Sequence, residues 1–167
     1  MIPGLYPLPD LQQAIREQPD HWRPLVFTNG CFDLLHAGHV RYLQAAKACG
    51  RTLVVGLNSD RSVRQIKPQT PGKPPRPIIP EDQRAEVLTA LSAVDGVVIF
   101  SEPTAHAVIA ALQPDIYVKG GDYTLASLPE APIVQSYGGR VEFVRIEVPS
   151  STSAIIERIL TSGGQSD

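Results

Sequence analysis

The sequence predicts an α/β protein with a doubly wound, Rossmann-like fold, in which a five-stranded parallel sheet carries helices on both faces. Two observations lead to this prediction. First, short apolar and β-branched segments alternate with segments of helical spacing from residue 24 onward, and such alternation is typical of right-handed βαβ units in one parallel sheet. Second, the apolar segments are nearly continuous, as expected for strands that are buried on both faces.

The first half of the chain supplies an extension and two strand–helix units. In the extension, residues 1–23, the segment DLQQAIREQ predicts a short helix capped by Asp10. Residues 24–30 (PLVFTNG) predict a buried strand that ends in a tight Asn-Gly turn. A helix is expected next, over residues 36–50. A second strand over 52–60 (TLVVGLNSD) ends in polar residues that can cap a further short helix.

A proline-rich loop interrupts this pattern, and three further strands follow it. Residues 68–80 contain six prolines, a density that no regular element tolerates, so we expect a loop of extended character there. The remaining elements are expected as a helix over 80–94, strands over 96–100, 115–122 and 140–146, and helices over 104–113, 133–139 and 151–160. The domain division expected from this pattern is the extension 1–23, one domain over 24–162 and a flexible tail over 163–167.

The composition argues against several classes of protein. No apolar run reaches the ~20 residues that a membrane span needs, and residues 1–20 lack the basic start and apolar core of a signal peptide. The two cysteines fit neither a disulfide framework nor a metal-ligand spacing. We therefore expect a cytoplasmic protein with reduced thiols and no membrane partner.

The charge pattern points to a small anionic ligand. The net charge of −2 at pH 7 argues against a general nucleic-acid binder, which usually carries a basic excess. Residues 61–76, however, hold five basic residues and no acid. Such a local positive band on a slightly acidic protein suits a small polyanion better than a long one.

The stretch NGCFDLLHAGH, residues 29–39, concentrates unusual chemistry after the first strand. Gly30 and Gly38 allow a tight turn and a close approach of ligand to backbone at a helix N-terminus, which favours phosphate. His36 and His39 are three residues apart and share one helical face, so both imidazoles can donate hydrogen bonds to phosphate oxygens. The alternatives are one capping and one core histidine, or a zinc site, for which a third ligand is not evident.

Residues 30–39 resemble the G-x-F-D-x-x-H-x-G-H signature of the cytidylyltransferase-like nucleotidyltransferases. The resemblance extends from Leu25 to Leu160, and blocks such as VVGLNSDRSVRQIK, DQRAEVLTAL, VKGGDY and STSAIIERI look like one branch, the single-domain D-glycero-β-D-manno-heptose 1-phosphate adenylyltransferases. The resemblance implies that AMP is transferred from ATP to that sugar 1-phosphate, and that the products are ADP-heptose and pyrophosphate. ADP-heptose would then serve the synthesis of the lipopolysaccharide core. Mg²⁺ is expected with ATP, held mostly by phosphate oxygens and water, since no protein ligands for a metal are apparent.

The resemblance also implies roles for individual residues. His36, His39 and Lys67 would be catalytic, and Asp33, Asn58 and Asp60 would bind the sugar phosphate. Nucleotide binding is implied for a set at strand ends and helix starts: Thr28, Asn29, Gly30, Phe32, Gly38, Arg84, Lys119, Gly121, Asp122, Ser151, Thr152 and Ser153.

Local chemistry leaves some of these roles open. One of the three hydroxyls at 151–153 is expected to cap the last helix while the others bind phosphate. Arg84 stands at a helix start, where its charge opposes the dipole, and this favours a ligand role. Asp33 could bind sugar hydroxyls or brace its loop. Because the loop 68–80 is longer than in that branch, Lys67, Lys73 and Arg76 all stay candidates for phosphate contact.

The sequence leaves two kinds of alternative open: other substrates for the same reaction, and a protein that binds nucleotide without catalysis. Cytidylyl transfer to glycerol 3-phosphate, or adenylyl transfer to pantetheine phosphate, would keep the same histidine loop. After KGGDYT the first acid is Glu130, later than usual in the branch, in a region that could contact the acceptor sugar. A non-catalytic nucleotide sensor would be expected to have lost a histidine or the basic band. A homodimer is possible.

Overall fold

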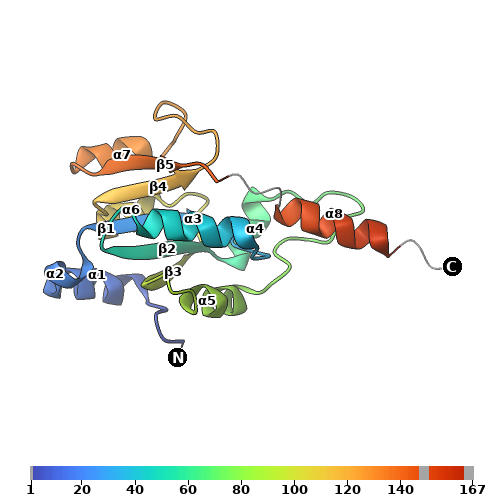
Figure 1. Cartoon of the computed structure of the whole chain (residues 1–167), viewed down its shortest axis with the longest axis horizontal. Coiled ribbons are helices and arrows are strands. Elements are labelled where there is room, and N and C mark those ends of the chain that lie inside the picture. The colour runs from blue at the N-terminus through green and yellow to red at the C-terminus, as the bar shows by residue number, and fades with distance from the viewer. Residues whose placement is uncertain (1, 147–150, 164–167) are drawn as a thin grey trace.

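The computed structural model describes residues 2–146 and 151–163 and confirms the predicted fold class. Its five strands are β1 (Leu25–Gly30), β2 (Thr52–Asn58), β3 (Gly96–Phe100), β4 (Ile116–Gly120) and β5 (Arg140–Val144). They form one sheet in the order β3-β2-β1-β4-β5, and every neighbouring pair is parallel (Figure 1). The order reverses at β1, which lies between β2 and β4.

Eight helices are found in the described residues, and those packed on the sheet cover both of its faces. They are α1 (Leu8–Glu17), α2 (Pro19–Trp22), α3 (Ala37–Lys47), α4 (Asp60–Ile66), α5 (Glu81–Thr89), α6 (His106–Leu112), α7 (Ala131–Ser136) and α8 (Thr152–Ser162). One apolar core joins α1, α2, α6 and α7 to the side chains of Phe27 and Tyr117. The other joins α3 and α5 to Val55 and Leu57 on the opposite face.

The expectation of strands buried on both faces is correct for β1 to β3 and wrong for β5. All seven residues of β2 are buried, whereas Arg140 and Phe143 of β5 are exposed. Both β3 and β5 are edge strands, but the backbone of residues 4–6 pairs with β3, whereas no described segment pairs with the outer edge of β5. Its sequence RVEFV alternates charged and apolar residues, as a half-covered strand does.

The segment expected as an extension, residues 1–23, packs against the domain. The backbone of Tyr6 and Gly4 pairs with Val97 on β3, and the side chains of Leu11 and Trp22 are buried in the first core. The predicted helix begins at Leu8, so the expectation of Asp10 as its cap is wrong. Asp10 lies in the first turn, where its charge still suits the helix dipole.

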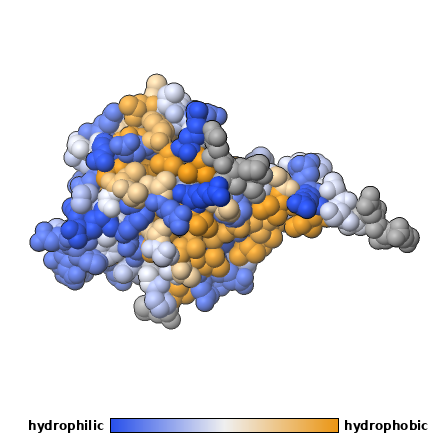
Figure 2. All heavy atoms as spheres, viewed as in Figure 1, coloured by the Kyte–Doolittle hydropathy of each residue, from blue (hydrophilic) through white to orange (hydrophobic). Residues whose placement is uncertain are grey.

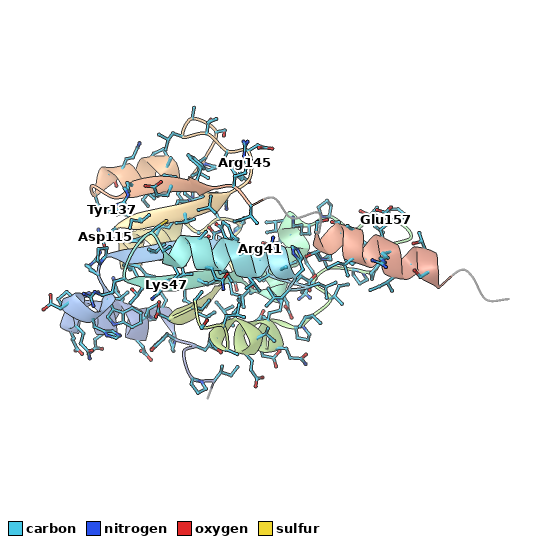
Figure 3. The ribbon with its side chains drawn as sticks, viewed as in Figure 1. Arg41, Lys47, Asp115, Tyr137, Arg145 and Glu157 are labelled. Carbon is cyan, nitrogen blue, oxygen red and sulfur yellow. The ribbon has the colours of Figure 1, made fainter. Side chains whose placement is uncertain are left out.

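Ion pairs join neighbouring segments at one end of the sheet. At the amino-terminal ends of the strands, Arg23 pairs with Asp115 and Lys47 with Asp95. Figure 3 shows Asp115 and Lys47 at that end and Glu157 of α8 at the other. The loop over 68–80 contains no helix or strand, as its prolines predict. After Gly163 the expected tail lies outside the described residues, as do residues 147–150 before α8.

Helix α8 projects from the body of the molecule at the carboxyl ends of the strands (Figure 1). Ile156 is its buried anchor, and the Thr152 hydroxyl donates to the carbonyl of Leu34. Figure 2 shows hydrophobic side chains gathered between α5 and α8, where Leu35, Val87 and Ile159 line a groove. Among the described residues, no helix has the length and apolar character that crossing a bilayer requires.

Candidate active site

A cleft of about 710 Å³ opens at the carboxyl ends of β1, β2 and β4. In open parallel sheets this edge, at the reversal of strand order, is where ligands bind. Most of the predicted site residues line it: Asn29, Gly30, Phe32, Asp33, His36, His39, Asn58, Lys67, Lys119, Ser151, Thr152 and Ser153. The others do not line it: Thr28, Gly38, Asp60, Arg84, Gly121 and Asp122.

The two histidine rings lie side by side, tilted by 37°, at the start of α3. His36 is the N-cap of this helix, and its Nδ1 accepts a hydrogen bond of 3.1 Å from the backbone N–H of Gly38. Because Nδ1 is the acceptor, the ring proton of the neutral imidazole lies on Nε2. The His36 and His39 ring centroids are 4.1 Å apart, and the Phe32 ring lies 5.5 Å from that of His39.

Burial keeps His39 uncharged. Desolvation, followed by the charge of the neighbouring His36, lowers the pKa of His39 from 6.5 to about 4. Its Nδ1 is buried and has no hydrogen-bond partner among the described residues. At neutral pH this ring can therefore donate a hydrogen bond, but it supplies no positive charge.

Positive charge comes from two basic side chains that line the cleft. Lys67 follows α4, and Arg76 lies in the proline-rich loop; both line the cleft, whereas Lys73 lines only a smaller neighbouring pocket. The N-terminus of α8 faces the same space with three hydroxyl residues. As expected, one of them caps the helix: the Ser151 hydroxyl accepts from the N–H of Ala154 at 3.1 Å.

Asp33 braces the proline-rich loop. Its carboxylate is fully buried, pairs with Arg76, and accepts hydrogen bonds from the backbone N–H groups of Ile78 and Ile79. With these partners its oxygens are already satisfied. Of the two roles that the sequence left open for Asp33, the geometry favours the brace over sugar binding, which stays an untested prediction.

Arg84 is a buried connector and not a wall of the cleft. Its side chain is inaccessible to solvent and donates to the carbonyls of Ile79, Cys31 and Asn58, besides its ion pair of 2.7 Å with Asp60. The expected ligand roles of Arg84 and Asp60 are therefore not supported. A guanidinium at a helix start opposes the dipole, but here three carbonyls and a carboxylate compensate for it.

Buried hydroxyls orient the groups behind the cleft. The Tyr117 hydroxyl donates to Asn29 Oδ1 at 2.7 Å, which leaves the amide N–H groups of Asn29 to face a ligand. Thr28 is buried and donates to the Tyr42 hydroxyl, which in turn donates to the carbonyl of Val118. Burial raises the pKa of Tyr42 to about 12, so this phenol stays protonated. Thr28 thus acts behind the cleft.

The predicted loop after β4 contributes only in part. Lys119 lines the cleft, and burial lowers its pKa; its Nζ lies 5.6 Å from the centroid of the Tyr123 ring. Gly121 supplies a left-handed turn at φ 90°, and Asp122 is exposed and 3.4 Å from Arg145. Sequence reasoning did not assign three polar lining residues, Cys31, Ser127 and Glu130, whereas Arg76 had been one of three candidates for phosphate contact. The only sequence feature that pointed to Glu130 was its position, since the first acidic residue after the Gly-Gly loop comes later than is usual in the branch.

Replacing Arg84 by glutamine is expected to lower the free energy of unfolding by about 3–5 kcal/mol, because a buried ion pair and three carbonyl partners are lost. Urea denaturation followed by circular dichroism measures this change. Arg140→Gln is the matched control, because its ion pair with Glu142 is exposed and should contribute less than about 1 kcal/mol. Equal effects of the two substitutions would contradict the connector role.

The low pKa of His39 predicts a pH-dependent stability. Between pH 6.5 and about 4 the unfolded ring binds a proton that the folded ring does not, so the free energy of unfolding should fall as the pH falls through this range. Urea denaturation at several pH values should show a shallower slope for His39→Asn than for the unsubstituted protein. An NMR titration in which His39 protonates at or above pH 6.5 would contradict its burial.

Comparisons with known proteins agree with this geometry. A family model described as cytidylyltransferase-like matches residues 27–159. The bifunctional protein HldE of Pelobacter propionicus is 55% identical over 150 residues, and that of Syntrophotalea carbinolica 50%; each match covers 90% of this chain but 30% of the relative. A lipopolysaccharide core biosynthesis protein from Thermoplasma volcanium superimposes with a TM-score of 0.58 at 29% identity, covering 75% of this chain and 97% of that one. The chain therefore belongs to the cytidylyltransferase-like family of nucleotidyltransferases.

Proposed function

We propose that this chain transfers AMP from ATP to D-glycero-β-D-manno-heptose 1-phosphate, giving ADP-heptose and pyrophosphate. The observation that carries the proposal is that one cleft brings together two adjacent imidazoles, two basic side chains and the N-terminus of α8. This set suits a triphosphate. The HldE relatives and the lipopolysaccharide core protein support the heptose branch over the glycerol phosphate and pantetheine phosphate alternatives.

The reaction needs little covalent help from the protein. An oxygen of the sugar phosphate attacks the α-phosphorus of ATP in line, a new phosphorus–oxygen bond forms, and pyrophosphate leaves with the electrons of the broken bond. The attacking oxygen is already anionic, so no general base is required. Catalysis then depends on positioning the two anions and on stabilising charge on the phosphoryl oxygens.

The chain's own groups divide this work. His36, through Nε2–H, and His39 donate hydrogen bonds to oxygens that gain charge at the α-phosphate. Lys67 neutralises charge on the phosphates, with Arg76 as the second cation of the same wall. The hydroxyls and free N–H groups at the start of α8 hold the part of the triphosphate that leaves.

Mg²⁺ fits this arrangement as a companion of ATP. Among residues 2–146 and 151–163 no three His, Cys, Asp or Glu side chains cluster as a metal site, and the Asp33 carboxylate is occupied. The ion would thus be held mainly by phosphate oxygens and water, with the cleft supplying few ligands. When bound, it neutralises charge on the departing pyrophosphate.

The proposal also includes the cellular compartment and the oligomeric state. Both cysteines are free thiols, which fits a reducing compartment, and we place the reaction in the cytoplasm. Homodimer formation stays a prediction.

His36→Ala and His39→Ala are each expected to reduce kcat for pyrophosphate release by about 10²–10³-fold, because each removes a donor to the reacting phosphate. The assay combines ATP with heptose 1-phosphate and identifies the ADP-sugar by chromatography. His21→Ala is the matched control, because His21 lies exposed on α2, outside the cleft.

Three outcomes would contradict the proposal. Unchanged turnover in both variants would remove the histidines from catalysis. Faster turnover of CTP with glycerol 3-phosphate, or of ATP with pantetheine phosphate, would keep the chemistry but replace the substrates. A purified protein that binds ATP without releasing pyrophosphate with any of these acceptors would be a nucleotide sensor.

A further inference from the structure

The cleft contains one carboxylate that the proposed reaction does not use. Glu130 precedes α7 and lines the cleft beside Lys119, Tyr123 and Ser127. Only 6% of its surface is exposed. A carboxylate in this position would repel phosphate, so it marks the part of the cleft that receives a portion of the substrate without negative charge.

The protein leaves this carboxylate largely without partners. Glu130 occupies the N-cap position of α7, yet its side chain makes no capping hydrogen bond. No ion pair or side-chain hydrogen bond to it is found among the described residues. Its oxygens are not among the fully enclosed polar atoms that lack a partner, so they are open to the cleft, where water or a ligand can donate hydrogen bonds to them.

The local backbone holds Glu130 in place before any ligand binds. His106 on α6 contacts the carbonyl of Pro129 through Nε2 at 3.1 Å and the Thr104 hydroxyl through Nδ1 at 2.8 Å. The preceding turn is closed by hydrogen bonds between Thr124 and Ser127. The site is therefore built from several elements and does not depend on one mobile side chain.

The charges along the cleft run from basic to mixed. Lys67, Arg76 and the start of α8 form the basic end. Near Glu130 the charges are mixed: burial lowers the pKa of Lys119, and the negative charge of Glu130 partly offsets this shift. The substrates of an adenylyl transfer consist of phosphates and polyhydroxyl sugars. The basic end suits the phosphates, which leaves hydroxyls for the end with Glu130.

We propose that Glu130 accepts hydrogen bonds from a pair of adjacent sugar hydroxyls and so selects a diol-bearing substrate. The inference rests on the proposed function and adds a residue to it. A carboxylate can accept from both hydroxyls at once, and charged acceptors form the stronger hydrogen bonds. The diol belongs either to the ribose of the nucleotide or to the acceptor sugar. Glu130 determines specificity and takes no part in the bond changes.

The test compares Glu130→Gln, which keeps the shape and removes the charge, with the matched control Glu142→Gln on the exposed face of β5. Initial rates are measured with ATP, 2′-deoxy-ATP and 3′-deoxy-ATP at varied sugar phosphate. We expect Glu130→Gln to raise one KM about 10–100-fold, the scale of a hydrogen bond to a charged group, with little change in kcat. Glu130→Asp should retain part of the affinity. Thermal unfolding reports whether each variant is folded.

The two sources of the diol give different results. If it is the ribose, the KM of ATP rises, and the preference of the unsubstituted protein for ATP over the deoxy nucleotides disappears. If it is the acceptor, only the KM of the sugar phosphate rises. Unchanged KM values and an unchanged preference in a folded variant would overturn the inference. So would a loss that excess Mg²⁺ restores, since Glu130 would then be a metal ligand.

Failure of the proposed function can be told apart from failure of this inference. If the unsubstituted protein does not use heptose 1-phosphate, the proposed function fails. The same KM comparison is then made with the acceptor that it does use. Calorimetric binding of a non-hydrolysable ATP analogue and its deoxy forms tests the ribose contact without any turnover.

Discussion

The hydrogen bond from the Gly38 backbone to His36 Nδ1 is the interaction on which the chemistry of this cleft depends. It puts the ring proton of the neutral imidazole on Nε2, so this nitrogen is a donor and not an acceptor. It forms because His36 is the N-cap residue of α3, and an N-cap side chain lies within reach of the free backbone N–H of the first turn. The adjacent, buried His39 stays neutral beside it. Both rings can donate hydrogen bonds to phosphate oxygens as charge develops, while Lys67 and Arg76 supply fixed positive charge.

Two buried charged residues, Arg84 and Asp33, fix the loop that carries these rings. Arg84 links the end of β1, the end of β2 and the start of α5, three segments far apart in the sequence. Asp33 links the histidine loop to the proline-rich loop through Arg76 and two backbone N–H groups. A charged residue close to a cleft can thus be essential to its shape without facing a ligand. Restraint of this kind keeps donors within the narrow range of positions that in-line phosphoryl transfer requires.

Much of the fold and part of the site could be predicted from the sequence. Continuous apolar runs alternating with helical spacing were enough for the parallel sheet, and strand-end motifs placed His36, His39, Lys67 and Lys119 at one edge. The exposure of β5 could not be predicted with the same rule, because it depends on which segments cover the edge strands: residues 4–6 pair with β3, and no described segment pairs with the outer edge of β5. The partners of Asp33 lie more than 40 residues away in the chain, beyond any local pattern. Glu130 reaches the cleft only through packing of its loop on α6, which no motif encodes.

The most direct test of the central claim is NMR observation of the histidine ring nitrogens, with and without a non-hydrolysable ATP analogue. The account predicts that His36 carries its proton on Nε2 and that the Nε2–H signals of His36 and His39 shift when the analogue binds, while His21 on α2 is unaffected. A proton on His36 Nδ1 would contradict it. So would bound nucleotide that leaves both rings unperturbed, because the two imidazoles would then not touch the phosphates.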